Sequence, residues 1–385
     1  MRFAFTDDQE ALRHSARRFL AERAPLAEVR RAADLPLGFD PDLWRRLGRD
    51  LGWTAITTPE PCEGLGLGHV DLAGLMEVMG GALLAAPFFT SACLAVDALR
   101  CVASPEQQRR LLPAIAAGDT LATLALTEPS GRWEAQAVAT EARPDGDGFI
   151  LNGVKRFVPD GAAADLLLVV ARAPGSAGER GLGLFPVPAD APGLTRRALP
   201  TMDATRPQAA LNLDGVRVAA ALGDPEGAWP GLRRALDLAA VALAAEQVGG
   251  AQRCLDMAVE YAKIREQFDR PIGSFQAIKH MCADMMVQVE CARSACYFAA
   301  WVADEDPDAL PEAAALARIA CSEAFFACAA QNIQIHGGVG FAWEHDAHLY
   351  FKRARSTEIL LGDPDFHRDR LAAMIGLHTN RAERS

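Results

Sequence analysis

Residues 148–158 read GFILNGVKRFV, and after a short gap residues 164–172 read ADLLLVVAR. Short apolar runs of this kind, bounded by turn signals, are typical of β-strands. The preceding Pro144-Asp-Gly-Asp-Gly148 predicts a hairpin turn. Four more short runs follow the same pattern: LATLALT (121–127), AVATEAR (137–143), GLGLFPV (181–187) and AALNLDGVRV (209–218). We therefore predict a small β-domain over residues 118–225, with at least five strands that do not form a parallel sheet.

Both flanks of this region have helical patterns. At the N-terminal end, Thr6 and Gln9 form a capping-box signature before an amphipathic segment. After the β-region, long Ala- and Leu-rich segments are ended by Asp306-Pro307 and by Gly337-Gly338. Helices this rich in alanine pack closely against several partners, as in a four-helix bundle. The predicted fold is mainly α with an inserted β-domain: helices over 1–117, strands over 118–225 and a helical bundle over 226–385.

The length of 385 residues suggests two or three domains, and the formal net charge is −11. A general nucleic-acid binder needs a basic face, so this charge argues against nucleic acid as a partner. We also expect no membrane span, because no stretch reaches about 18 uncharged apolar residues. Residues 235–245 come closest, but they include Asp237 and are followed by Glu246.

The nine cysteines are scattered and form no CxxC pair. We interpret them as small buried hydrophobic residues in a reducing cytoplasm. His336, His345 and His348 lack the further ligand that would complete a metal site, so no metal is expected. The sequence also contains no GxGxxG after a strand, no P-loop and no nucleophile elbow.

Two segments carry most of the chemical information, YAKIREQFDRPIGSFQAIKH (261–280) and QIHGGVGFAWEHDAH (334–348). With the Gly-rich loop at 64–68, Leu126-Thr-Glu-Pro129 and residues 152–158, they occur in an order and spacing that resemble the acyl-CoA dehydrogenase family of flavoproteins. The resemblance covers residues 1 to about 375. It implies a helical N-domain, a middle β-barrel or sandwich and a C-terminal four-helix bundle.

The resemblance also implies an activity. Members of this family use FAD for the α,β-dehydrogenation of an acyl-CoA thioester to a 2-enoyl-CoA, in fatty-acid or other lipid metabolism. A carboxylate takes the α-proton while hydride leaves the β-carbon for the flavin. The usual electron acceptor is an electron-transfer flavoprotein. The family assembles as a dimer of dimers, a homo- or hetero-tetramer in which each FAD is completed by the neighbouring subunit.

The resemblance implies two sets of cofactor-binding residues, one for the FAD of a neighbouring subunit and one for the chain's own FAD. The half-site that this chain would offer to a neighbour consists of Arg265 at the pyrophosphate, Gln267, Phe268 and Gln276 at the adenosine, and Gln334, Gly337 and Gly338 where the backbone approaches the cofactor. The chain's own flavin contacts would be Leu126, Thr127 and Phe157. Three structural alternatives stay open: a surface ion pair of Arg265 with Glu266 or Asp269, a helix stop at Gly337-Gly338, and a buried strand threonine at 127.

The chain departs from the family in its own flavin site. Phe157-Val158-Pro159 stands where members usually have Trp-Ile-Ser or Trp-Ile-Thr, and Pro159 has neither a side-chain donor nor an N–H. Ser130-Gly131-Arg132-Trp133 replaces the usual Gly-Ser-Asp stretch. The half-site offered to a neighbour departs from the family only at Asp269, which replaces a usual glycine.

The catalytic glutamate is missing from both of its usual positions, which are Leu361 and Ala239 here. Glu246 is the leading substitute, because an unpaired carboxylate in an Ala-rich helix would have a raised pKa. It lies seven residues from Ala239, about 10 Å along a helix. Glu358, one helical turn before Leu361 if that segment is helical, and Asp363 are the other candidates.

Three functions remain open from the sequence. The first is an acyl-CoA dehydrogenase with a substituted base. The second is a non-catalytic subunit of a heterotetramer, which gives its FAD half-site to a homologous partner that carries the glutamate. The third is a different flavin reaction, or a hydroxylation, on a CoA thioester.

Overall fold

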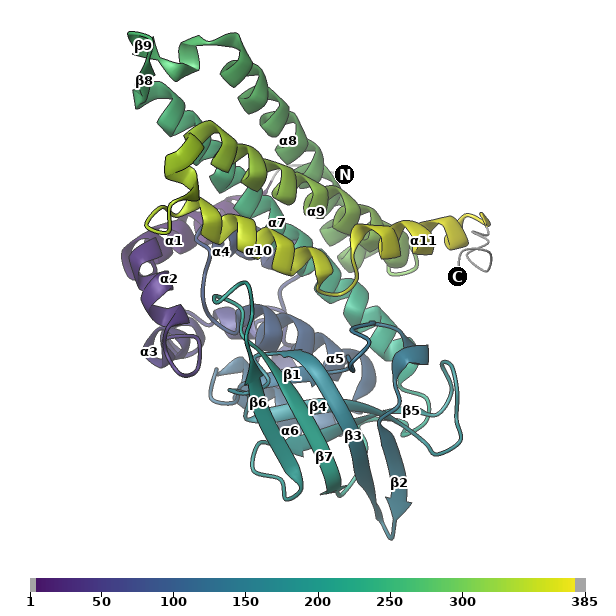
Figure 1. Cartoon of the computed structure of the whole chain (residues 1–385). Helices are drawn as coiled ribbons and strands as arrows, with labels where there is room; N and C mark the ends of the chain where they lie inside the picture. Colours follow the sequence, from purple (N-terminus) through teal and green to yellow (C-terminus); the bar gives the residue numbers. More distant parts are fainter. Residues whose placement is uncertain (1–4, 378–385) are drawn as a thin grey trace. The chain divides into compact units, whose positions relative to one another are not determined.

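The computed structural model describes residues 5–377 (Figure 1). It contains two compact units. One consists of Met1–Val29, His69–Leu84 and Ala240–Ser385, and the other of Arg30–Gly68 and Ala85–Ala239. We call them the bundle unit and the sheet unit. The long helix α7 (Trp229–Ile264) passes from the sheet unit into the bundle unit.

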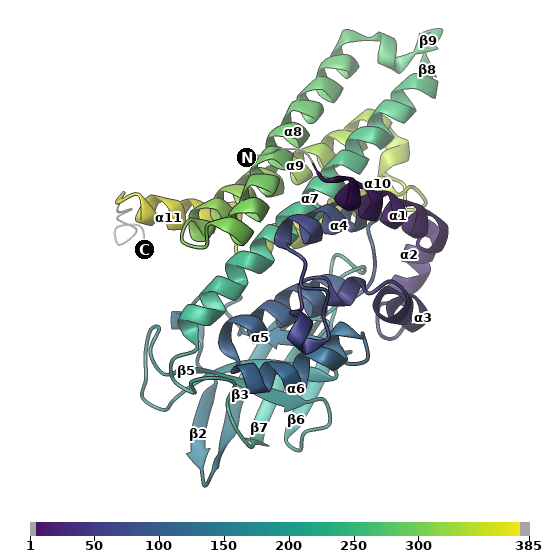
Figure 2. The same cartoon turned by 180° about the vertical axis from the view of Figure 1, so that it is seen from behind.

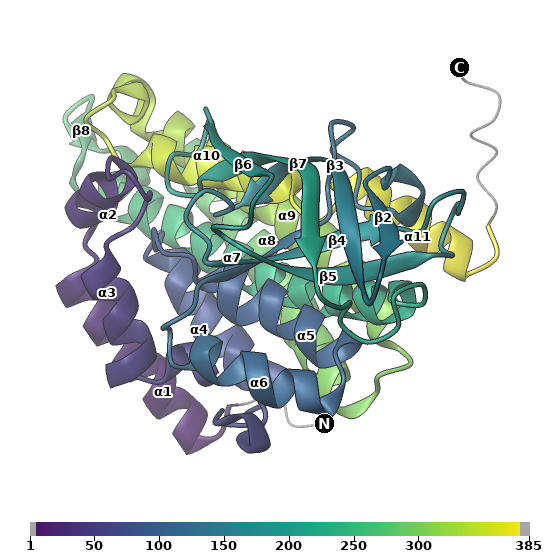
Figure 3. The same ribbon diagram turned by 90° about the horizontal axis from the view of Figure 1, so that it is seen from below.

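In the described part of the chain, the sheet unit has one sheet of seven strands in the order β1-β4-β2-β3-β7-β6, with β5 paired to β4 (Figure 3). The strands are β1 (Ala122–Ala125), β2 (Glu141–Asp145), β3 (Gly148–Pro159), β4 (Leu166–Arg172), β5 (Leu182–Pro188), β6 (Leu194–Leu199) and β7 (Gln208–Val218). The predicted hairpin is confirmed, since β2 and β3 pair antiparallel up to Asp145 and Gly148. The sheet is mixed, because β1 runs parallel to β4.

The same unit also contains the short helices α3 (Pro41–Arg45), α5 (Val96–Val102) and α6 (Pro105–Ala116). A π-helical segment, Phe89–Ala95, lies against β1, where the Ser91 hydroxyl accepts from the Ala122 N–H at 3.2 Å. The helix α2 (Leu26–Ala33) crosses the boundary between the units in sequence.

The bundle unit is built from long helices (Figure 2). They are α1 (Asp7–Arg23), α4 (His69–Gly81), most of α7, α8 (Gln276–Glu305), α9 (Leu310–His336), α10 (Ala347–Ile359) and α11 (Pro364–Met374). The predicted capping box of Thr6 and Gln9 is present at α1. A two-stranded hairpin, β8 (Glu266–Gln267) and β9 (Arg270–Pro271), joins α7 to α8.

Glycines allow α4 and α7 to cross in direct backbone contact. A Cβ on Gly249 would lie 1.8 Å from the carbonyl oxygen of Glu77, and one on Gly80 would lie 2.0 Å from that of Glu246. Only glycine fits at both places, because no side-chain carbon tolerates such a distance.

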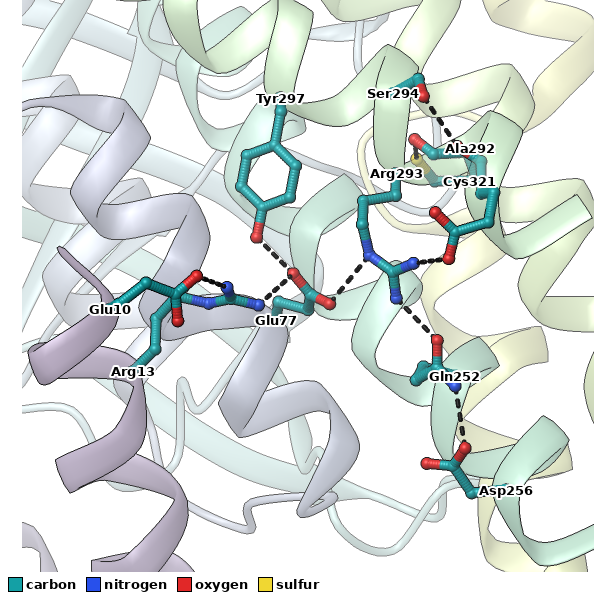
Figure 4. A network of polar contacts seen from close by, with 11 residues as sticks. Glu10, Arg13, Glu77, Gln252, Asp256, Ala292, Arg293, Ser294, Tyr297 and Cys321 are labelled. Atoms are coloured by element: carbon teal, nitrogen blue, oxygen red, sulfur yellow. Dashed lines mark hydrogen bonds and ion pairs between the residues drawn. The ribbon is translucent and has the colours of Figure 1, made fainter. Parts of the chain in front are cut away.

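A buried polar cluster ties α1, α4 and α8 together beside this crossing (Figure 4). The Glu77 carboxylate accepts from Arg13 at 3.3 Å, from Arg293 at 3.2 Å and from the Tyr297 hydroxyl. Arg293 also donates to Gln252 on α7 at 2.7 Å. The cluster fixes the N-terminal helix to the bundle, since each group satisfies another that is buried with it.

One segment, Leu310–Phe341, is long and apolar enough to cross a membrane by length and composition alone. The sequence had instead suggested residues 235–245 as the nearest candidate. Its apolar window is 61% buried, and α9 packs against α8, α10 and α11. The core helix of a bundle has these properties too, so the finding is weak evidence for a membrane span.

Candidate functional site

The structure brings the two informative segments together at one end of the bundle unit. The ring of Tyr261, near the end of α7, stacks on that of His336, the last residue of α9, with centroids 4.2 Å apart. The hairpin β8–β9 follows Tyr261 and the glycine pair follows His336. All seven residues expected to contact a neighbour's cofactor are exposed here: Arg265, Gln267, Phe268, Gln276, Gln334, Gly337 and Gly338.

The hairpin presents its residues through a left-handed turn. Phe268 and Asp269 have φ values of 55° and 59°, between the paired residues Gln267 and Arg270. Two positive φ values are the mark of a type I′ turn, where a glycine is favoured and aspartate is tolerated. The Phe268 side chain is 87% exposed. Within residues 5–377, Arg265 has no ion pair with Glu266 or Asp269, so its guanidinium is available to a phosphate.

The glycine pair has an open surface. Gly337 has φ 62° and ψ −141°, a conformation that side chains avoid, and it ends α9 as predicted. A Cβ on Gly337 or Gly338 would meet no atom within 4 Å in the described structure. Large apolar side chains are exposed around this end: Ile264, Val339, Phe341 and Trp343. Open backbone, a free guanidinium and uncovered apolar area fit a nucleotide cofactor and a second protein surface.

In the sheet unit, two of the three expected flavin contacts, Leu126 and Thr127, are hydrogen-bonded to residues of β3. The Thr127 hydroxyl donates to the Arg156 carbonyl oxygen at 2.6 Å, and the Arg156 N–H donates to Thr127 at 2.9 Å. The carbonyl oxygen of Leu126 accepts from the ammonium of Lys155 at 3.1 Å. Thr127 is thus a buried threonine just after β1, and its hydroxyl oxygen can still accept a hydrogen bond.

Phe157 and Pro159 show what the altered tripeptide does. Phe157 is half-buried and has a φ of 59°, a strained value for an aromatic residue. The Pro159 carbonyl oxygen accepts from the Thr123 hydroxyl at 2.7 Å. The stretch therefore offers no donor at position 159, and this half of the site fits a flavin less well than the half at the end of the bundle.

A buried ion pair supports the same strands. The ammonium of Lys155 lies 2.8 Å from Glu128, with Lys155 fully buried. Burial lowers the pKa of Lys155 to about 8, against the opposing charge of Glu128. Burial would raise the pKa of Glu128, but Lys155 and the hydrogen bonds of Thr140 hold it below its ordinary value. The pair stays charged at neutral pH.

Neither usual base position carries a carboxylate in the folded chain. Leu361 is buried with φ 64°, in the turn between α10 and α11, and Ala239 is fully buried in α7. The helical offset expected for Glu358 is wrong, because α10 ends at Ile359 and Leu361 is outside it.

The three substitute carboxylates all have structural partners. Glu246 was expected to be unpaired, and this is wrong: its Oε1 lies 2.6 Å from Nη1 of Arg353, and both side chains are buried. Glu358 forms an ion pair with Arg355 one turn earlier. The Asp363 carboxylate accepts from the Phe366 N–H at 2.8 Å and caps α11.

Sequence reasoning missed Arg318, which holds the turn around Leu361. It is fully buried in α9 and donates to the carbonyl oxygens of Thr357 at 2.9 Å, Leu360 at 3.0 Å and Gly362 at 3.2 Å. It also donates to the Gln247 side chain at 2.6 Å. Burial lowers the pKa of Arg318 to about 10, which leaves it charged. A lone arginine within Ala-rich α9 was the available signal.

Nothing in the described residues gathers three histidine, cysteine or acidic side chains at a possible metal site. The nine cysteines are all free thiols.

Sequence profiles of one family match nearly the whole chain. The acyl-CoA dehydrogenase N-terminal domain matches residues 6–119, the middle domain residues 123–216 and the C-terminal domain residues 229–376. The chain is 36% identical to the acyl-CoA dehydrogenase IpdE2 of Mycobacterium tuberculosis, over 93% of this chain and 94% of that protein.

Solved structures agree with this relationship. One is the ChsE4–ChsE5 complex from Mycobacterium tuberculosis, with a TM-score of 0.87, 31% identity, and coverage of 98% of this chain and 100% of that chain. Another is a variant of the Tcur3481–Tcur3483 steroid ACAD, with a TM-score of 0.85, 32% identity, and coverage of 96% and 98%. The chain belongs to the acyl-CoA dehydrogenase family.

Proposed function

We propose that this chain is a subunit of an FAD-dependent acyl-CoA dehydrogenase that makes a 2-enoyl-CoA, and that a homologous partner chain supplies the catalytic carboxylate. The observation that carries this proposal is that the usual base positions hold no carboxylate and that the candidate substitutes are bonded to other groups. Leu361 and Ala239 occupy the base positions, and Glu246, Glu358 and Asp363 each have a structural partner. A base must reach the α-proton with a free carboxylate oxygen.

The chain's contribution is the half-site at the end of the bundle. FAD, when bound, supplies the acceptor for the hydride from the β-carbon. Arg265 would bind the pyrophosphate, and Gln267, Phe268 and Gln276 would hold the adenosine. Gly337 and Gly338 would let the cofactor approach the backbone closely, because no side chain stands there, and Gln334, three residues before Gly337, would lie beside it. The exposed apolar residues around them would be covered by the partner.

Two similar structures, ChsE4–ChsE5 and Tcur3481–Tcur3483, are of paired proteins, which supports an assembly of unlike chains. We infer a heterotetramer in the cytoplasm, where the free cysteines stay reduced, with an electron-transfer flavoprotein as electron acceptor. Tcur3481–Tcur3483 is a steroid ACAD, so a steroid acyl-CoA belongs in the substrate panel.

A second candidate is a homomeric dehydrogenase in which Glu246 is the base. It is favoured by one observation, the position of this carboxylate inside the helical bundle. This role requires Arg353 to release the carboxylate when substrate binds.

Co-expression with a neighbouring homologous gene tests the proposal. We expect a stable complex of the two chains with fewer FAD molecules than chains, and flavin bleaching with an acyl-CoA only in the complex. The panel should contain short, branched and steroid acyl-CoA thioesters. A purified homomer with one FAD per chain that bleaches with any of them would refute the subunit role and favour the second candidate.

A further inference from the structure

A pocket of about 530 Å³ opens between α1, the start of α2, α4, α7 and α10, entirely within the bundle unit. Its size falls in the range of small-molecule sites, roughly 300–1,000 Å³. One wall is apolar and made of small or aliphatic residues, with Leu20, Ala24, Gly81, Ala82 and Gly249 among them. These residues form a smooth concave surface beside the close crossing of α4 and α7.

The pocket is separate from the family's reaction site. Along α7 it begins at Gly249, which lies ten residues beyond Ala239, or about 15 Å. Along α10 it touches Tyr350, whereas Leu361 lies beyond the other end of that helix. The buried pair of Glu246 and Arg353 therefore lies between the pocket and the base positions on both helices.

The two carboxylates that line the pocket are already bonded. Glu77 is shared by Arg13, Arg293 and Tyr297, and one oxygen of Asp256 accepts from Gln252 at 2.8 Å (Figure 4). Three donors of the protein occupy Glu77, and Gln252 occupies one oxygen of Asp256.

The lining donors are less committed. Arg17 is exposed and has no ion-pair partner within residues 5–377. Arg253 bonds the Tyr350 hydroxyl and has one long contact, 3.7 Å, with the exposed Glu260. Tyr350 itself donates to the Gly81 carbonyl oxygen at 2.8 Å. Two arginines thus line the pocket together with the apolar wall, and their guanidinium groups are suited to a carboxylate or phosphate oxygen.

We propose that this pocket binds an anionic amphiphile: an apolar body against the small-residue wall and a carboxylate head between Arg17 and Arg253. Its residues come from one chain, so the proposal does not depend on the function proposed above.

Isothermal titration of the FAD-loaded protein tests this with three probes that share one chain: dodecanoate, dodecanol and dodecylamine. We expect dodecanoate to bind most tightly and the amine most weakly. The double variant Arg17→Gln/Arg253→Gln should raise the Kd for dodecanoate about tenfold or more, because charge-assisted bonds are lost. The matched control Arg109→Gln/Arg110→Gln changes two exposed arginines of α6 in the other unit and should leave the Kd unchanged.

A second variant tests the apolar wall. Ala82→Phe adds a ring at the pocket wall and leaves the close-packed glycines Gly80 and Gly249 unchanged. It should remove the binding of dodecanoate and dodecanol alike. Dodecanoate can also enter the acyl site, but that binding would not respond to these variants. The proposal is overturned if dodecylamine binds as well as dodecanoate, or if the double variant keeps the wild-type Kd.

Discussion

Replacing Glu246 by glutamine removes one charge from a buried ion pair and changes almost no volume. The Oε1–Nη1 distance to Arg353 is 2.6 Å, and the two side chains are 4% and 2% exposed. At an effective dielectric constant near 20, the attraction is about 6 kcal/mol, much of it offset by the cost of burying both charges. The variant keeps the buried guanidinium and loses its counter-charge. We therefore expect a loss of about 3–5 kcal/mol in the free energy of unfolding.

Urea denaturation of the FAD-loaded protein measures this loss as a lower unfolding midpoint with an unchanged slope. The matched control is Glu246→Gln/Arg353→Met, which removes the second charge and should recover most of the stability, since replacing a whole buried pair is often nearly neutral. A loss below about 1 kcal/mol, together with loss of substrate-dependent flavin bleaching, would refute a structural role for Glu246 and identify it as the base.

Three further predictions concern the half-site, acid stability and the base position. Arg265→Ala should weaken flavin retention on dilution without lowering the unfolding midpoint, because an exposed phosphate contact is lost and no core volume is removed; full FAD occupancy in gel filtration would contradict this. Burial and the charges of Arg318 and Arg370 lower the pKa of His367 to about 3, so the unfolded chain binds a proton that the folded chain refuses between pH 6.5 and about 3. As the pH falls through that window, the free energy of unfolding should fall by up to about 1.4 kcal/mol per pH unit. His367→Gln should reduce this dependence on pH, as measured by urea denaturation at several pH values. Leu361→Glu in the chain alone should give no flavin bleaching with any acyl-CoA, because Pro159 still lacks a donor; a gain of bleaching would show that only the base is missing.

The parts of the fold that the sequence predicted are those fixed by neighbours in the chain. The capping box at Thr6, the hairpin between Asp145 and Gly148 and the end of α9 at Gly337 each depend on a few adjacent residues. The parallel pairing of β1 with β4 was not predictable in this way, because Ala122 and Leu166 are 44 positions apart and their register depends on tertiary packing.

The candidate site also has one part that depends on adjacent residues and another that depends on tertiary packing. Its exposed half lies in two continuous segments, so the resemblance to the family could assign expected roles to residues at 265–276 and 334–338 from the sequence. The acidic residues are different, because their chemistry depends on partners. Two partners were within reach of sequence reasoning: Arg355 lies three residues before Glu358, a helical ion-pair spacing, and Asp363 precedes a proline that begins a helix.

The partner of Glu246 was not within reach, and it decides how the residue is interpreted. Arg353 is 107 positions away, and only the packing of α10 against the rest of the bundle unit brings its guanidinium to the carboxylate. An Ala-rich helix predicts that a carboxylate is buried but not whether it is paired, and these two cases have opposite consequences. An unpaired carboxylate is pushed toward the neutral form, whereas one beside a guanidinium is held charged and in place. The same residue is a candidate base in the first case and a structural anchor in the second, which is why we propose that a second chain carries the catalytic carboxylate.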